Sequence, residues 1–183
     1  IEVMHFITWP VNRVWPDDGR SLWSDASAQS ERGEAIVAIA AKYQGVQGVI
    51  LSPLTEPHGT TPGEIAGDHA LPRSVWDGLY KRIVVAVRAI DASRWMVIEP
   101  IWSAPKYFSS ITPLTDSQLM YGYHVYAPHE LTHQGTGEWS SSRDIQYPGL
   151  SRDEANSVHL NWDIAQLEAY LAPAVRFGIT HQV

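Results

Sequence analysis

Residues 46–59 read VQGVILSPLTEPHG, an apolar run that leads directly into a carboxylate, Glu56, with Pro57 immediately after it. The run from Val46 to Leu54 is typical of a buried strand, and a proline cannot donate to the next rung of a sheet. A Glu at the C-terminal end of a buried strand is held rigidly, as a general acid must be. An ordinary solvated loop Glu has the same local pattern, so the pattern alone leaves both interpretations open.

Strand-like and helix-like segments alternate on both sides of this run. Strands are predicted at residues 1–7, 46–54, 95–99 and 120–126. Helices are predicted at residues 26–43, at about 74–90 and at about 161–177, and the segment around Pro105 and Pro113 carries at most a short helix. Such alternation is typical of a parallel sheet with crossover helices.

The helix at residues 74–90 has the clearest pattern. Ser74 is predicted to cap it, with Asp77 at capping-box spacing. One apolar stripe at three- and four-residue spacing follows: Trp76, Leu79, Tyr80, Ile83, Val84, Val87 and Ile90. In the last helix, Pro173 is expected to cause a kink.

Four strand–helix units fit either half of an eight-stranded β/α barrel or a small open doubly wound sheet. No glycine-rich phosphate loop follows any predicted strand, which counts against a nucleotide-binding open sheet. Polar and aromatic residues instead follow the strand ends, where barrel enzymes keep their chemistry. The expected fold class is therefore α/β, a partial (β/α)8 TIM barrel of about four consecutive units.

The amino-acid composition argues against several classes of function. The 183 residues carry 20 acidic and 13 basic side chains, a net charge of −7, which argues against a nucleic-acid partner. No apolar run is long enough to span a membrane, and the absence of cysteine excludes disulfides and thiolate metal sites. Trp and Tyr number eight each. They fit either an aromatic core or sugar binding, because indole faces stack on pyranose rings.

Two further groups of residues lie at or just after predicted strand ends. His124 and Tyr126 are two residues apart, so on a strand they share one face; the alternative is a core Tyr with a satisfied His. Glu99 ends the third predicted strand, and Trp102 follows that strand end and could stack on a sugar. Histidines also gather at His124, His129 and His133, but their spacing matches no helical metal motif, and no metal site is expected.

Several stretches together resemble the family-five glycoside hydrolases, the cellulase or endoglucanase family. Residues 54–59 are similar to that family's Asn-Glu-Pro strand. The other similar stretches occur in the same order as in the family: residues 22–25, 87–91, 97–100, 123–128, 132–135 and 147–149. The resemblance covers nearly the whole chain and rests on the joint order and spacing of motifs that are each weak alone.

The resemblance implies a role for each matching residue. Glu56 corresponds to the family's acid/base, and Thr55, His58, Trp102, His124 and Tyr126 are expected to bind substrate. It gives Glu99 no catalytic role, so Glu99 is expected to be structural or supporting. The implied activity is retaining endo-hydrolysis of a β-1,4-linked glucan or a related polysaccharide. No cofactor and no specific protein partner are expected.

The resemblance also implies that residues 1–183 are one incomplete catalytic domain covering the third to sixth strand–helix units. The chain has no initiator Met and shows no signal peptide at its start, so it is interpreted as truncated at both ends. The nucleophile, a Glu ending the seventh strand, is then expected beyond Val183. The chain alone is expected to be inactive, and its parent to be secreted.

Three residues depart from the family pattern. Thr55 stands where the family has Asn, Ile7 stands where it presents a His, and Pro53 interrupts a run that is normally continuous strand. These departures suit a diverged subfamily, and they also suit a non-catalytic glycan-binding protein on the same scaffold. An open-sheet enzyme unrelated to polysaccharides is a further alternative, against which the missing phosphate-binding glycines and nucleophile elbow count.

Overall fold

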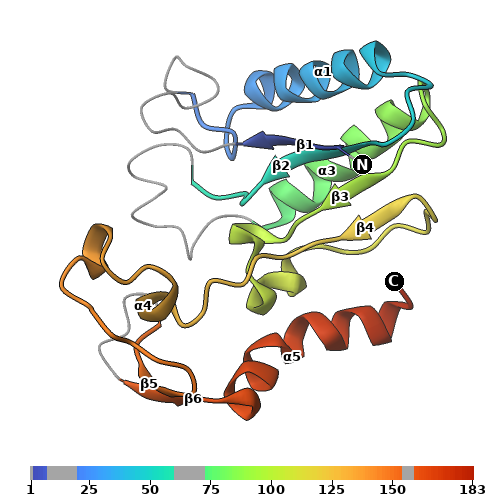
Figure 1. Ribbon diagram of the computed structural model, residues 1–183. Coiled ribbons are helices and arrows are strands. Elements are labelled where there is room, and N and C mark those ends of the chain that lie inside the picture. The colour runs from blue at the N-terminus through green and yellow to red at the C-terminus, as the bar shows by residue number, and fades with distance from the viewer. Residues whose placement is uncertain (1, 8–19, 60–72, 154–158) are drawn as a thin grey trace.

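The computed structural model describes residues 2–7, 20–59, 73–153 and 159–183. Its centre is a four-stranded sheet in the order β1 (Glu2–Ile7), β2 (Val49–Thr55), β3 (Met96–Ile98) and β4 (Leu119–Tyr121) (Figure 1). Each strand is parallel to the next one along the chain. The predicted alternation and the parallel sheet are therefore confirmed, and the C-terminal ends of the strands lie at one edge.

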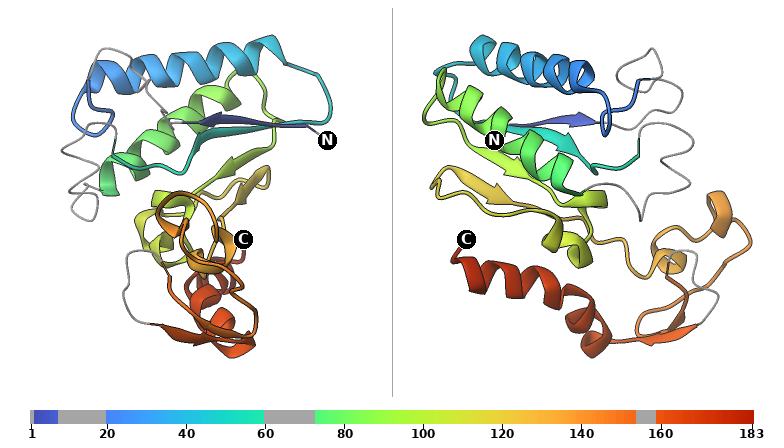
Figure 2. Two further views of the ribbon diagram at one scale, coloured as in Figure 1. Left: turned by 60° about the vertical axis from the view of Figure 1, so that its left-hand side comes forward. Right: turned by 180° about the vertical axis from the view of Figure 1, so that it is seen from behind.

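Two helices lie side by side along the sheet. Helices α1 (Ala26–Lys42) and α3 (Arg73–Arg88) run together beside β1, β2 and β3, whereas α5 (Ile164–His181) lies beyond β4 (Figure 2). Asp25 caps α1, because its side chain accepts a hydrogen bond from the amide of Ala28 at 3.0 Å. Gly45, at φ 73°, follows the end of the helix and adopts the left-handed conformation that glycine tolerates.

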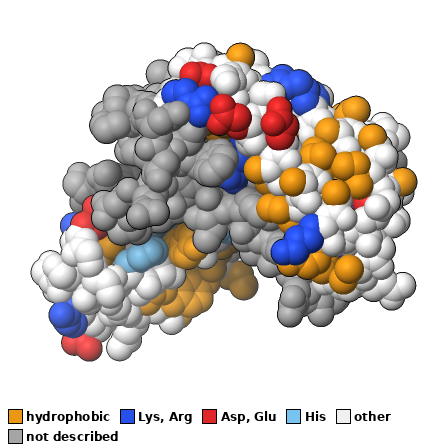
Figure 3. Space-filling model, turned by 90° about the horizontal axis from the view of Figure 1, so that it is seen from above, with side chains coloured by type: hydrophobic (Ala, Val, Ile, Leu, Met, Phe, Trp, Pro, Cys, Tyr) orange, Lys and Arg blue, Asp and Glu red, His pale blue; other side chains and the backbone are white. Residues whose placement is uncertain are grey.

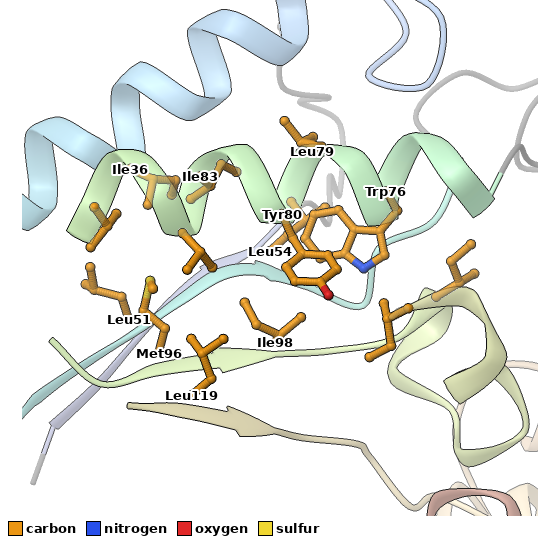
Figure 4. Close-up of a cluster of buried hydrophobic side chains, with 14 of the residues drawn as sticks. Ile36, Leu51, Leu54, Trp76, Leu79, Tyr80, Ile83, Met96, Ile98 and Leu119 are labelled. Atoms are coloured by element: carbon orange, nitrogen blue, oxygen red, sulfur yellow. The ribbon is translucent and has the colours of Figure 1, made fainter. Parts of the chain in front are cut away.

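The core fills the space between α3 and the sheet, as Figure 4 shows. Six residues of the predicted α3 stripe are buried: Trp76, Leu79, Tyr80, Ile83, Val84 and Val87. They meet Leu51 and Leu54 of β2 and Met96 and Ile98 of β3, all at most 1% exposed. Ile90 lies past the end of α3 and is only partly buried. Burial of this apolar surface is the main favourable term that holds α3 on the strands.

Pro53 lies inside β2 rather than ending it. Ser52 pairs with His5 and Thr55 pairs with Ile7, so the register with β1 shifts across Pro53. A proline lacks the N–H that a regular ladder needs, and a local irregularity accommodates it. Pro53 thus interrupts only the regular pairing of β2 with β1, and β2 itself continues to Thr55.

The chain after β3 forms two 3-10 helices, η2 (Ile101–Ser103) and η3 (Pro105–Ser110). This confirms the expectation of at most a short helix there. Helix α5 packs against η3 and β4 through Phe177, whose ring centroid lies 4.7 Å from that of Phe108 and 5.3 Å from that of Tyr121. Among the described residues, the chain between β3 and β4 therefore contains no α-helix. Helix α5 packs against the short 3-10 helix η3 of this segment.

The predicted end of the fourth strand and the predicted cap of α3 are wrong. The fourth strand ends at Tyr121 instead of residue 126, because the chain beyond β3 turns into η2 and the amide of His124 donates to the carbonyl of Ser103 at 2.8 Å instead of to a strand. Ser74 is not the cap of α3, since that helix already includes Arg73. Asp77 instead accepts from the amide of Thr112 at 2.6 Å and pairs with Lys81.

The segment before α5 contains a small antiparallel pair of strands that the sequence analysis missed. Strands β5 (Gly149–Ser151) and β6 (Leu160–Trp162) follow the short helices α4 (His129–Thr132) and η4 (Gly137–Trp139). The last helix consequently begins at Ile164, where Asp163 accepts from the amide of Gln166 at 3.0 Å, and not at residue 161. The helix includes Pro173 and continues to His181.

A buried carboxylate joins α4 to this strand pair. Glu130 is 4% exposed and accepts hydrogen bonds from the guanidinium and the backbone amide of Arg152 and from the hydroxyl of Ser142. The hydrogen bonds from Arg152 lower the pKa of Glu130 to about 2. Glu130 therefore remains ionised throughout the neutral range and fixes the loop region to the strand pair.

Some large hydrophobic side chains remain exposed on the helices. Val85 of α3 is 69% exposed, and Ile164 and Ile179 of α5 are 72% and 74% exposed. Figure 3 shows hydrophobic side chains gathered on one side of the surface, with Lys and Arg side chains near them. Among the described residues, no helix is long and apolar enough to cross a membrane.

Candidate active site

Glu56 directly follows the C-terminal end of β2, as predicted. Its backbone has φ 49°, a left-handed conformation that costs a non-glycine residue on the order of 1–3 kcal/mol and persists only where its surroundings impose it. Its side chain is 23% exposed. The buried strand and the irregular backbone together hold a partly exposed carboxylate at the edge of the sheet where all four strands end.

His124 binds this carboxylate directly. Its Nδ1 lies 2.7 Å from Oε1 of Glu56, within the range of a strong hydrogen bond. His124 comes from the segment after β4, so residues 68 positions apart meet at the same end of the sheet. The structure thus confirms the predicted common location of Glu56 and His124, although His124 is not on a strand.

Glu99, at the end of β3, lies beneath this pair and is 2% exposed. Its Oε2 accepts a hydrogen bond from the amide of Glu56 at 3.0 Å and another from the hydroxyl of Ser103. Its Oε1 lies 3.5 Å from the hydroxyl of Ser52 and 3.8 Å from Nε2 of His124. The carboxylates of Glu56 and Glu99 therefore both face the imidazole of His124. The buried carboxylate of Glu99 also accepts a hydrogen bond from the backbone amide of Glu56.

Trp102 and His58 form a stacked pair. Their ring centroids are 4.3 Å apart and the planes are inclined by 9°. His58 is only 3% exposed, and its Nδ1 bonds the carbonyl of Gly59 at 2.7 Å. The ring of His58 thus supports one face of the indole, and Trp102, which is half-buried, is the member of the pair closer to solvent.

Tyr126 is 44% exposed and lies beside His124, with ring centroids 6.0 Å apart. Burial of the phenol raises its pKa, and the negative charges of Glu56 and Glu99 raise it further. The hydroxyl of Tyr126 is therefore a neutral hydrogen-bond donor over the physiological range. Thr55 precedes Glu56, and its hydroxyl lies 3.5 Å from that of Ser52.

The other histidines of this region form a separate group. The rings of His129 and His133 stack with centroids 5.3 Å apart, and Nδ1 of His129 lies 2.6 Å from Oδ1 of Asp153. Tyr126 lies between this group and His124, 5.5 Å from the ring of His133. Within the described residues, no group of three or more His, Asp or Glu side chains is arranged to hold a metal ion.

Sequence reasoning missed Ser103 and Ser52 as members of the site. Their hydroxyls matter because they contact a carboxylate 4 and 47 positions away in the sequence. Ser103 has φ 50° and Trp102 has φ 56°, so the turn after β3 is as irregular as the turn after β2. Neither serine stands in a motif, and only the placement of Glu99 at a strand end offered a signal.

The family of the chain follows from comparison of its sequence with known proteins. Residues 4–179 match the model of the family described as Cellulase (glycosyl hydrolase family 5). Endoglucanase C of Acetivibrio thermocellus is 28% identical over 56% of this chain. Endoglucanase 3 of Fibrobacter succinogenes is 27% identical over 44% of this chain. The chain spans 35% and 13% of the lengths of these two relatives.

Solved structures show the same fold. A hyperthermophilic endo-β-1,4-glucanase, solved in complex with substrate, matches 99% of this chain with a TM-score of 0.69 at 18% identity, and the match covers 50% of that protein. Endoglucanase Cel5A of Thermotoga maritima matches 88% with a TM-score of 0.67, covering 47% of its own length. The four parallel strands and their helices are thus a partial TIM barrel, and the chain belongs to the cellulase family, glycosyl hydrolase family 5.

Proposed function

We propose that this chain forms the acid/base side of a retaining endo-β-glycosidase that acts on β-1,4-linked glucan. The observation that carries the proposal is the position of Glu56: a partly exposed carboxylate at the end of β2, hydrogen-bonded to His124. Membership of the cellulase family and similarity to endoglucanases support the same reaction class. The substrate-bound endo-β-1,4-glucanase supports the choice of linkage.

Glu56 has two proton-transfer tasks in this proposal. Its carboxylic acid gives a proton to the glycosidic oxygen as the bond to the anomeric carbon breaks, and its carboxylate later takes a proton from the water that releases the sugar. His124 orients Glu56, because a hydrogen bond of 2.7 Å restricts rotation of the carboxyl group. The hydrogen bond also stabilises the carboxylate between the two steps.

Three neighbouring side chains are proposed to bind the substrate. Tyr126 offers a hydroxyl donor beside His124, and Trp102 offers an indole face supported by His58. Thr55 stands next to Glu56, and its hydroxyl can reach a sugar hydroxyl. His58 supports Trp102 in this scheme instead of contacting the sugar, since the side chain is almost fully buried.

The nucleophile is proposed to come from sequence outside residues 1–183. A retaining site needs a second carboxylate about 5–5.5 Å from the first, on the opposite side of the anomeric carbon. Glu99 is a second carboxylate at the strand ends beside Glu56, but it is buried and binds the amide of Glu56 itself. Glu99 is therefore ill-placed to attack a sugar, and the complete enzyme would include further strands. A polymeric substrate also favours a secreted enzyme.

One observation favours a second candidate, a non-catalytic glycan-binding protein on the same scaffold. Thr55 occupies the position before Glu56, and its hydroxyl lies 3.5 Å from that of Ser52 at the inner side of β2. A short hydroxyl there reaches less far toward a bound sugar than a carboxamide would. This candidate keeps the binding roles of Trp102 and Tyr126 but predicts no turnover by any form of the protein.

The test compares leaving groups in the complete enzyme. Glu56→Gln is expected to lower kcat on unactivated β-glucan by roughly 10²–10⁴-fold. Glycosylation by an aryl β-cellobioside with a good leaving group should slow much less, because that oxygen needs little protonation. Equal losses on the two substrates would mean that Glu56 is not the acid. No turnover by the unsubstituted enzyme would favour the glycan-binding alternative.

A further inference from the structure

Glu99 is a buried carboxylate whose hydrogen-bond donors all belong to the candidate site. The donors that reach it are the amide of Glu56 and the hydroxyls of Ser103 and Ser52. Its own backbone carbonyl accepts from Nε1 of Trp76 in α3 at 2.8 Å. Glu99 thus connects the turn after β2, the turn after β3 and the helix that covers both.

The backbone of Glu56 depends on this connection. The amide of Glu56 points at both Oε2 of Glu99 and Oγ of Ser103, each 3.0 Å away, and the hydroxyl of Ser103 donates in turn to Glu99. With its amide held in this way, Glu56 has a left-handed φ of 49°. Without the acceptors, the residue would gain by relaxing toward an ordinary φ, and that rotation would move its side chain away from His124.

The ring of His124 is held by the same group. Nδ1 bonds Glu56 at 2.7 Å, Nε2 faces Glu99 at 3.8 Å, and the amide of His124 donates to the carbonyl of Ser103 at 2.8 Å. The distance to Glu99 is too long for a direct hydrogen bond, so that contact is electrostatic. Both ring nitrogens therefore face carboxylates, which fixes the orientation of the imidazole plane.

We infer that Glu99 is a positioning residue: through its hydrogen bonds it holds Glu56 in the left-handed conformation and orients His124, so that the acid/base carboxyl points to the sugar. This inference rests on the proposed function for its catalytic consequence. The positioning itself can be measured without turnover. Glu99 touches neither the sugar nor the transferred proton in this scheme.

Two substitutions separate the contribution of the carboxylate charge from that of its hydrogen bonds. Glu99→Ala removes both side-chain oxygens of Glu99 and leaves Oγ of Ser103 as the acceptor for the amide of Glu56. Glu99→Gln retains one side-chain oxygen for the amide of Glu56 and the hydroxyl of Ser103. Asp91→Asn is the matched control: Asp91 is also a buried carboxylate, 6% exposed, but it pairs with Arg94 before β3, at the opposite end of the sheet from Glu56. A loss that arises only from general destabilisation should occur in the control as well.

The first measurement is amide hydrogen exchange of the 183-residue chain, with each variant's rates corrected for its global stability. Glu99→Ala should speed exchange at Glu56 by at least roughly tenfold relative to the other protected amides, since one hydrogen bond to a charged acceptor is lost. Glu99→Gln should have a smaller effect, and Asp91→Asn none. Equal, uniform changes in Glu99→Ala and Asp91→Asn would overturn the inference.

The second measurement is kinetic and uses the complete enzyme. Glu99→Ala should lower kcat on β-glucan more than on an activated aryl cellobioside and leave KM nearly unchanged, and Glu99→Gln should restore much of kcat. If Glu99→Ala and Glu99→Gln lose kcat equally, hydrogen-bond positioning is refuted. Failure of the proposed function would give a different result. In that case the kcat of Glu56→Gln would fall equally on substrates with good and poor leaving groups, whereas the faster amide exchange at Glu56 in Glu99→Ala would still be observed.

Discussion

Trp76 joins the hydrophobic core to the candidate site, so replacing it with Phe tests that connection. The side chain is 1% exposed, and its Nε1 donates to the backbone carbonyl of Glu99 at 2.8 Å. Phe keeps a six-membered ring but removes the N–H and leaves a void beside Tyr80, whose ring centroid lies 5.9 Å away. The carbonyl of Glu99 would then lose this donor inside the core.

Two costs add in this substitution. Leaving a buried acceptor without its donor costs about 1–3 kcal/mol, and a small cavity in a packed core adds about 1 kcal/mol. The expected destabilisation is therefore about 2–4 kcal/mol, which for a chain of this size lowers Tm by roughly 5–12 °C. Urea unfolding followed by far-UV circular dichroism measures it without relying on tryptophan fluorescence.

Trp95→Phe is the matched control, because Trp95 is 41% exposed. A substitution at such a surface position should cost less than about 0.5 kcal/mol. If Trp76→Phe and Trp95→Phe have the same free energy of unfolding within error, the indole hydrogen bond does not stabilise the turn after β3, and the reasoning fails.

Two further predictions concern other carboxylates. The pKa of Glu130 is lowered to about 2, mainly by the hydrogen bonds from Arg152. The ionised side chain therefore stabilises the fold fully above about pH 4.5, and this stabilisation is lost as the pH falls toward 2. Glu130→Gln should flatten the pH dependence of the unfolding free energy between about pH 2 and 5, and an unchanged slope would contradict this. The 183-residue chain should not hydrolyse soluble β-glucan, because Glu99 is committed to the amide of Glu56; turnover that survives purification and disappears in Glu99→Gln would show that Glu99 is the second carboxylate.

The sequence predicted those parts of the structure that local pattern controls. The apolar run before Glu56 specified a buried strand and placed the carboxylate at its end, and the stripe on α3 specified the buried face of that helix. The end of β4 was not predictable in this way. Tyr123–Tyr126 has strand-like composition, but the backbone of His124 finds its partner in the carbonyl of Ser103, a contact that depends on how the preceding turn folds.

The arrangement around Glu99 shows why the site was predicted only in part. Glu56 and His124 were predicted as site residues from motifs, and their placement after two parallel strands of one sheet, β2 and β4, was enough to predict that they lie at the same edge. The contacts of Glu99 with Ser52 and with the amide of Glu56 join positions 47 and 43 residues apart. No local periodicity encodes such contacts. They depend on strand register and on the left-handed turn at Glu56, which is a property of the folded chain.

The central claim is that Glu56 is the acid/base of a retaining site, and chemical rescue tests it most directly. In the complete enzyme carrying Glu56→Ala, an aryl β-cellobioside with a good leaving group should form the glycosyl-enzyme without acid assistance. Added azide should then enter the space of the missing carboxylate, form a bond to the anomeric carbon and displace the nucleophile. The prediction is a faster release of β-cellobiosyl azide. An α-configured azide would identify Glu56 as the nucleophile, and no effect of azide would contradict its assignment as the acid/base.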